Sequence, residues 1–431
     1  MPRRFPFLTS PLSAAVFAVA VPTLAADDRH ASDVPPEVAA ILGQNRIELP
    51  DLFRLAELTS PTLAAARAEV AAGAGRLRRV GAYANPTIGF GIEEASVEDF
   101  SDRKEMVEIV QPILLGGRRG PAKATLSAEL AATELLLDDV RRDVRGRAHA
   151  LLIEISYNGT RSDAVTELIA EASRTYEIAR RRFEARAVPE SHATRALLSR
   201  YELELASDRA DAERLSAVEQ LSALLGGLDV RADQLAAPPL LEEEPDTPLL
   251  IERLLTTHPR IAAAHLEIDA AEARHRWVRV RRLPDFDLRA AYGRQVSLDE
   301  RFIEAGIGIR LPLFDRNQGE VEEALAEVRR ANQRAHEAER DLVAQLTVAS
   351  RRRSLAAQQL TSLRETLEPA AARGLSQARA AYQGGALSFF ELLDAQQTYA
   401  RVRTQTLEIE RDLNRATAEL SGLAGLGPYQ D

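Results

Sequence analysis

The sequence predicts a membrane β-barrel joined to a long α-helical barrel, built from a tandem repeat and shared between chains. Four segments of about ten residues alternate between apolar and polar positions, which indicates two-faced strands. The segments between them keep the helical spacing of apolar residues over unusual lengths. The whole pattern then occurs a second time, roughly two hundred residues later.

The composition favours long helices over one large globular core. The chain has 431 residues, of which 5% are aromatic and 28% are charged, and alanine is abundant. It has no cysteine, which excludes disulfides, thiolate metal sites and a lipid-anchored N-terminal cysteine. The formal net charge of −10 argues against nucleic acid as a partner.

Residues 1–26 have the features of a secretory signal peptide. Arg3 and Arg4 supply the positive end, a short apolar run follows, and small residues precede Asp27. The alternative is an apolar N-terminal helix of the mature fold, which the four prolines of this stretch disfavour. No later segment has the roughly twenty consecutive apolar residues of a membrane-spanning helix.

The first repeat is expected at residues 27–227. Its expected elements are a polar irregular arm at 27–49, a helix from Asp51 to Gly81, a β-hairpin at 85–114 and a long helical hairpin at 119–226. The turn of the helical hairpin is placed at Pro189, because proline ends a helix. Apolar residues in the first long helix follow steps of three and four, which predicts coiled-coil-like packing.

A proline-rich acidic linker at 228–247 leads to a second repeat at 248–425. Its expected elements are a helix from Leu249 to Arg282, a β-hairpin at 284–312 and a long helical hairpin at 316–424. A short tail is expected at 426–431.

Prolines and other landmark residues of the first repeat have counterparts at a nearly constant distance in the second. The matching pairs are 198 to 200 residues apart: Pro61 with Pro259, Pro86 with Pro284, Pro112 with Pro312, Phe183 with Tyr382, and Leu224 with Leu423. Five landmarks that agree within two residues indicate a duplicated unit.

Four strands per chain cannot close a barrel, because small closed barrels need about eight. With a signal peptide present, the sequence favours a membrane barrel shared between chains, with apolar side chains outward and polar ones inward. The alternative is a soluble antiparallel sheet with one buried face.

Three stretches resemble the TolC-like outer-membrane efflux ducts: Gln111 to Ala122, Leu311 to Ala324 and Tyr382 to Ala395. The first two, which are strand-to-helix junctions, are most similar to the cobalt–zinc–cadmium efflux subgroup. The resemblance covers about residues 50–425. It implies a homotrimer with a twelve-stranded shared barrel, located in the outer membrane and extending into the periplasm. It also implies two partners, a periplasmic adaptor protein and an inner-membrane pump of the resistance–nodulation–division class.

The resemblance also implies a pore constriction at the periplasmic end, carried here by Glu391 and Asp394. Three copies of each carboxylate in a narrow mouth would repel one another and attract cations. The matching positions of the first repeat are His192 and Arg195, so opposite charges on neighbouring hairpins could hold the mouth shut. The alternative is that the acids are solvated residues at a helix start, where the helix dipole favours them.

The hairpin turns are expected to be the tips that dock on the adaptor. They comprise Ala187, Val188 and Pro189 in the first repeat and Gly384, Gly385, Ala386 and Leu387 in the second. The first turn lacks the glycine that the family often has there.

The sequence gives no sign of an enzyme, a cofactor site or a metal site. The seven histidines are scattered, and none forms a helical pair four residues apart. The predicted function is therefore a passive outer-membrane channel of a tripartite efflux system, exporting divalent heavy-metal cations. Two alternatives stay open: a duct for drugs or type I protein secretion, and a periplasmic coiled-coil scaffold without a pore.

Overall fold

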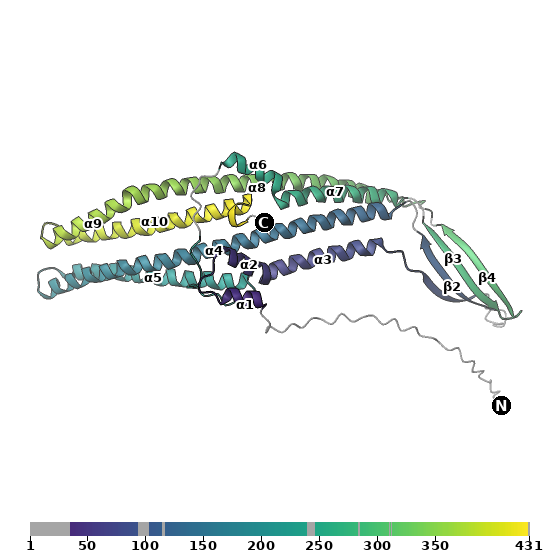
Figure 1. The fold of residues 1–431 in the computed structure, drawn as a ribbon, viewed down its shortest axis with the longest axis horizontal. Helices are drawn as coiled ribbons and strands as arrows, with labels where there is room; N and C mark the ends of the chain where they lie inside the picture. Colours follow the sequence, from purple (N-terminus) through teal and green to yellow (C-terminus); the bar gives the residue numbers. More distant parts are fainter. Residues whose placement is uncertain are drawn as a thin grey trace, which may run out of the picture.

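The computed structural model of the chain describes residues 35–93, 103–113, 117–238, 246–282, 285–309, 311 and 313–429. The predicted signal peptide at 1–26, the loop at 94–102 and the predicted breakers Pro284 and Pro312 lie outside these residues. The described chain is elongated. A β-sheet lies at one end, and helices run from it to two hairpin turns at the other end (Figure 1).

Helices and strands occur in the same order in both halves. The first half contains α1 (Pro36–Leu42), α2 (Leu49–Thr59), α3 (Pro61–Gly81), β1 (Thr87–Glu93), β2 (Lys104–Ile113), α4 (Arg119–Glu184) and α5 (Glu190–Leu224). The second half contains α6 (Thr247–Thr257), α7 (Pro259–Val280), β3 (Phe286–Gln295), β4 (Glu300–Ile309), α8 (Gln318–Ser362), the π-helical turn η2 (Leu363–Leu367), α9 (Glu368–Gln383), α10 (Phe389–Ala424) and the 3-10 turn η3 (Gly427–Tyr429).

Each half is built on one very long helix. α4 has 66 residues, which is about 100 Å at 1.5 Å per residue. α8 continues through η2 into α9 and reaches the second hairpin turn. Two shorter helices accompany each long helix end to end, α3 and α5 beside α4, and α7 and α10 beside α8 and α9 (Figure 1).

A glycine follows each of the helices α5 and α10, at the end away from the hairpin turns. Gly226, just after α5, has φ +76°, and a Cβ there would lie 2.6 Å from the carbonyl oxygen of Thr59. Only glycine fits this left-handed position against the break between α2 and α3. Gly425 ends α10 with φ +61°, and its carbonyl accepts a 2.9 Å hydrogen bond from Arg253.

The helices expected at Asp51–Gly81 and Leu249–Arg282 are each broken in two, which corrects the sequence prediction. Ser60 and His258 have extended ψ angles of 122° and 124°. Each precedes a proline, whose ring disfavours the helical conformation of the residue before it. Pro61 and Pro259 therefore break the helix in both repeats as well as matching in register.

The expected irregular arm at 27–49 is wrong in its described part. Residues 36–42 form α1, and Ile47 pairs in a parallel bridge with Leu235. Val230 is fully covered, so the described part of the expected linker packs back onto the first half. Tyr429 of the expected tail packs there as well, since it is 1% exposed and belongs to the same apolar core.

The four described strands form one antiparallel sheet in the order β1-β2-β3-β4. Residues directly opposite each other across antiparallel strands point to the same face, so the register assigns every side chain to a face. One face is apolar and exposed, with Phe90 at 84% and Ile303 at 81% exposure. Its apolar members include Ile88, Phe90, Ile92, Val107, Ile109, Ile113, Leu288, Tyr292, Ile303, Ile307 and Ile309.

The opposite face of the sheet carries polar side chains and glycines. Glu108 and Glu304 lie on this face at one level, flanking Ala291. At the next level Phe302 covers Gly293, where a Cβ would lie 2.4 Å from the ring. None of the described helices is both long and apolar enough to cross a bilayer.

Candidate functional site

The two hairpin turns have the same backbone shape despite different sequences. Arg186 and Gly385, 199 residues apart, both take left-handed conformations, with φ of 58° and 77°. In both turns the next residue donates a backbone hydrogen bond to a carbonyl five residues earlier, at 2.8 Å from Ala187 and 2.9 Å from Ala386. This pattern is the Schellman helix ending. Arg186 therefore takes the place of the glycine that the first turn lacks.

Glu391 caps the helix that follows the second turn. Its carboxylate accepts a hydrogen bond from the Ser388 backbone amide at 2.9 Å, and the Ser388 hydroxyl accepts one from the Glu391 amide at 3.3 Å. This reciprocal pair is a capping box. The hydrogen bonds from Ser388 lower the pKa of the Glu391 carboxyl, so Glu391 stays charged in the first turn of α10. Asp394, one turn further along α10, is also exposed.

His192 and Arg195 face aromatic rings of α10. The His192 ring stacks on Phe389 with centroids 4.8 Å apart, and the Arg195 guanidinium lies 4.6 Å from the centre of the Phe390 ring. Among the described residues of this single chain, no ion pair joins either of them to Glu391 or Asp394. The pairing between neighbouring copies stays a prediction.

The two helical hairpins meet through an apolar cluster next to the turns. Phe389 and Tyr382 lie at its centre with ring centroids 5.9 Å apart. Its other buried members are Ala179, Ala193, Ala196, Leu375, Leu392 and Leu393. Sequence reasoning missed this cluster, although two adjacent phenylalanines directly after a serine cap could have indicated it.

Polar contacts join the hairpins further from the turns. Gln396 donates to the Thr175 hydroxyl at 2.7 Å, and Arg379 pairs with Glu171 at 2.5 Å. A groove of about 620 Å³ lies between α4, α5, α9 and α10 at this level. At this level the contacts between the hairpins are polar, and a further apolar cluster of Tyr157, Ala164 and Leu407 joins them beyond it.

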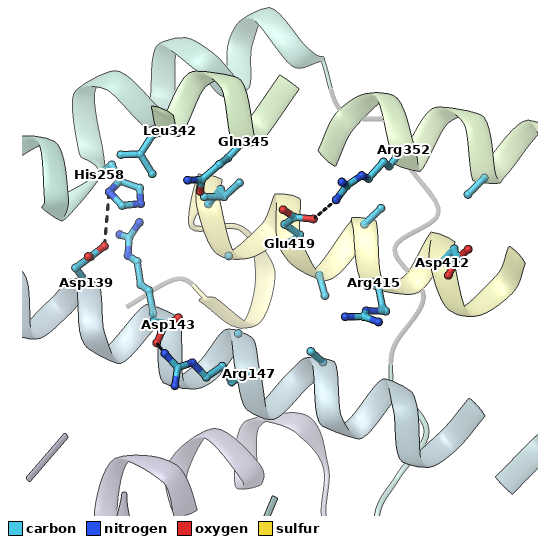
Figure 2. Close-up of a pocket in the computed structure, with 18 of the residues that line it drawn as sticks. Asp139, Asp143, Arg147, His258, Leu342, Gln345, Arg352, Asp412, Arg415 and Glu419 are labelled. Atoms are coloured by element: carbon cyan, nitrogen blue, oxygen red, sulfur yellow. Dashed lines mark ion pairs between the residues drawn. The ribbon is translucent and has the colours of Figure 1, made fainter. Parts of the chain in front are cut away.

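A larger cavity of about 1240 Å³ lies midway along the molecule between α4, α8 and α10. Figure 2 shows two ion pairs in its wall, Asp143 with Arg147 at 2.6 Å and Arg352 with Glu419 at 3.8 Å. His258 begins α7 here, and its Nδ1 accepts from the Arg260 amide at 3.2 Å. Burial lowers the pKa of His258 to about 4, so the ring is neutral.

The cavity lacks the features of a catalytic or metal centre. Asp139 lies 4.0 Å from His258, and burial raises the pKa of this carboxyl. In the part of the chain that the structure describes, no three His, Cys, Asp or Glu side chains are grouped to hold a metal ion. The charged side chains of the wall mostly neutralise one another.

Part of the sequence matches a known protein family. Residues 250–426 match the family described as outer membrane efflux protein. The match covers the second of the two repeats. With the metal-resistance relatives below, it indicates that the chain is an efflux channel of the outer membrane that extends into the periplasm, and not an enzyme.

The efflux protein also resembles individual proteins over most of its length. It is 25% identical over 364 residues to the cobalt-zinc-cadmium resistance protein CzcC of Cupriavidus metallidurans, covering 84% of this chain and 86% of CzcC. It is 25% identical over 327 residues to the nickel and cobalt resistance protein CnrC of the same organism, covering 71% of this chain and 70% of CnrC. The solved structure of the outer-membrane channel OprN superposes with a TM-score of 0.77 at 17% identity, covering 88% of this chain and 90% of OprN.

The fold of the efflux protein is thus that of TolC-like channels. The expected tip residues Ala187, Val188 and Pro189 lie in the turn between α4 and α5. Their counterparts from Gly384 to Leu387 lie in the turn between α9 and α10. Both turns are at the end of the molecule opposite the sheet (Figure 1).

Proposed function

We propose that three copies of this chain form one export duct, with their sheets closed into a twelve-stranded barrel. The observation that carries the proposal is the sheet itself, whose register gives one apolar and one polar face. β1 and β4 are the edges of the sheet and have unpaired backbone groups. Exposed edges cannot remain in a bilayer, and pairing β4 of one copy with β1 of the next removes them.

Exposed apolar residues on the helices support the same lateral contact. α5 carries Leu198, Tyr201 and Leu205 at steps of three and four, each about half exposed. On α8, Val348 and Leu355 are exposed one heptad apart. α5 and α8 flank the central helices α4 and α10, so copies related by rotation would join these two stripes head to tail.

We further propose that the duct carries divalent heavy-metal cations. Two observations support this substrate: the names of the relatives CzcC and CnrC, and the acidic mouth formed by Glu391 and Asp394. In a threefold assembly these positions place six carboxylates around the periplasmic opening, where a ring of acids favours cations. Arg195 and His192 of the adjacent hairpin then balance the acids and keep the mouth narrow.

The two hairpin turns are the proposed docking tips for a periplasmic adaptor, which links the duct to an inner-membrane pump of the resistance–nodulation–division class. The firm apolar cluster beside the turns supports this role, because it presents both tips together. The polar contacts and the groove further along leave room for the hairpins to separate as the mouth opens.

Planar-bilayer conductance of the purified full chain tests the proposal. We expect cation-selective conductance that falls in the Glu391→Gln and Asp394→Asn double variant, because the charged ring is lost. Arg195→Glu should raise the conductance of the closed mouth, with Arg373→Glu, an exposed arginine in α9, as the matched control. Absence of conductance from wild-type protein that assembles as trimers would contradict the duct.

A deletion strain separates the possible cargoes. Sensitivity to cobalt, zinc or cadmium salts, restored by the wild-type gene, is the expected outcome. Sensitivity to drugs alone, or loss of a secreted protein alone, would contradict the metal assignment while leaving the duct intact.

A further inference from the structure

A strongly basic zone surrounds the molecule where the helices meet the sheet. We call it the collar. It consists of four segments at the helix ends: the end of α3 with the residues after it (76–83), the residues before α4 with its start (117–123), the end of α7 with the residues after it (274–282), and the residues before α8 with its start (313–320). These four segments contain twelve arginine and lysine residues and two carboxylates, in a chain whose net charge is −10. The charge of the chain is therefore reversed at this level.

Many of the collar cations have no acidic partner. Within the described residues, six exposed cations of the collar form no ion pair: Arg78, Arg79, Lys123, Arg279, Arg282 and Arg316. At the opposite end of the sheet, Arg103 pairs with Glu105 at 2.8 Å and Arg294 with Asp299 at 2.5 Å, and among the described residues there Arg301 forms no ion pair. The unpaired charge is thus concentrated at the helical end of the sheet.

Aromatic side chains accompany the cations. The Arg119 guanidinium lies 3.6 Å from the centre of the Tyr83 ring, and Arg281 lies 5.5 Å from the centre of the Trp277 ring. Tyr83 is 80% exposed, and Phe314, four residues before α8, is 94% exposed. Exposed aromatic residues that continue an apolar barrel surface mark the boundary between hydrocarbon and water.

We propose that the collar binds the phosphate groups of anionic phospholipids in the periplasmic leaflet of the outer membrane. The inference rests on the proposed barrel, whose apolar face meets lipid and ends at the collar. A guanidinium binds phosphate through two parallel hydrogen bonds, and arginine is weakly hydrated, so both properties suit a headgroup layer. The headgroups supply the negative charge that the chain itself does not place there.

The collar has a second consequence for the depth of the duct in the membrane. Leu311 and Leu313 follow β4 with 62% and 63% exposure, and Arg316 comes three residues after Leu313. Bound headgroups at this level fix the boundary at which the barrel ends and the periplasmic helices begin. The long helices then reach a constant distance into the periplasm.

Lipid binding by the full-length assembly tests the proposal. Purified protein in neutral detergent is titrated with phosphatidylglycerol or with zwitterionic phosphatidylcholine, and bound lipid is counted by native mass spectrometry. The test variant is Arg79→Gln, Arg279→Gln and Arg282→Gln together. The matched control is Arg209→Gln, Arg351→Gln and Arg373→Gln, which removes the same charge from exposed, unpaired arginines of α5, α8 and α9.

We expect wild type and control to prefer phosphatidylglycerol over phosphatidylcholine. The collar variant should lose affinity for phosphatidylglycerol by about fivefold for each charge that contacts the headgroup, the equivalent of roughly 1 kcal/mol per cation at an anionic surface. A variant with lysine at the three collar positions should retain most of the affinity, which separates charge from a folding defect.

Several outcomes would overturn the proposal. Equal retention of both lipids by wild type, or an equal loss in the control variant, would mean that the collar has no special role. An unchanged lipid affinity with altered anion permeability would place the three arginines on the inner wall. Wild-type conductance is measured in parallel, so a conducting duct without lipid preference refutes this inference alone.

Discussion

The left-handed residues of the two hairpin turns provide a sharp test of their equivalence. Arg186 and Gly385 have φ of 58° and 77° at matching positions. An L-residue pays about 1–2 kcal/mol in this conformation, whereas glycine adopts it freely. Glycine also gives the unfolded chain more conformational entropy, which lowers the stability of the folded state by about 0.4–1 kcal/mol. The two terms leave a net difference of about 0.5–1 kcal/mol per chain in favour of glycine.

We therefore expect Arg186→Gly to stabilise the protein and Gly385→Ala to destabilise it by similar amounts. A Cβ at Gly385 would meet nothing within 4 Å, so the change acts on the backbone alone. Gly374 in α9 is the control, since its Cβ would also meet nothing but its conformation is helical. Gly374→Ala should stabilise the protein by up to about 1 kcal/mol.

The measurement is denaturant unfolding of purified protein in detergent, followed by the helical circular dichroism signal. The opposite signs of Arg186→Gly and Gly385→Ala are the decisive result. If both variants were destabilised, or if Gly385→Ala behaved like Gly374→Ala, the two turns would not share one backbone conformation in solution.

Three further predictions concern the middle of the molecule and the cap at the mouth. Burial lowers the pKa of His149 and of His258 from 6.5 to about 4, so the unfolded state binds protons at a higher pH than the folded state. The free energy of unfolding should therefore decrease as the pH falls from 6.5 towards 4, by about 2 kcal/mol per histidine at pH 5, as measured by melting experiments. Replacing His149 and its hydrogen-bond partner Tyr429 together with phenylalanine should remove one of these two contributions, and an unchanged pH dependence would contradict the assignment. Gly226→Ala should cost about 2 kcal/mol or more, because its Cβ would overlap the Thr59 carbonyl, and a melting temperature equal to wild type would contradict this. Ser388→Ala should cost about 1 kcal/mol by loss of the cap and should return the Glu391 pKa towards its usual value, which titration by NMR checks.

Local periodicity made much of the fold predictable from the sequence. The alternating residues around Phe90 and Ile303 fall on the same exposed face of the sheet, because a two-residue period fixes which side of a strand each residue takes. The long helix α4 follows from apolar steps of three and four, without a pair of glycines and with no proline beyond its first turn. These signals depend on neighbours in sequence and require no knowledge of tertiary contacts.

The features that were missed depend on contacts between distant segments. Tyr429 was assigned to a tail, yet its hydroxyl lies 3.0 Å from Nδ1 of His149 and its ring packs against Phe53. No local pattern in the last residues of the chain indicates a partner 280 positions earlier. The aromatic environment of His192 and Arg195 was missed for the same reason, since the rings belong to the opposite hairpin.

The candidate mouth residues were found by register between the repeats and by resemblance. The structure adds that Glu391 is engaged with Ser388, a local interaction that the Ser-x-x-Glu spacing could have indicated. Any contact of Asp394 with a neighbouring copy would form only between chains of the proposed trimer. The structure places Glu391 in the first turn of α10, while the pore constriction at Glu391 and Asp394 stays a prediction for the conductance experiment.

The open edges of the four-stranded sheet have a genetic consequence. Because each copy completes its sheet only with its neighbours, a subunit that inserts normally but cannot open would be built into tubes beside normal subunits. With equal expression and random mixing in threefold assemblies, only about one tube in eight would contain normal subunits alone. Alleles that block the mouth without harming the strands should therefore be dominant, whereas alleles that destroy β1 or β4 should be recessive.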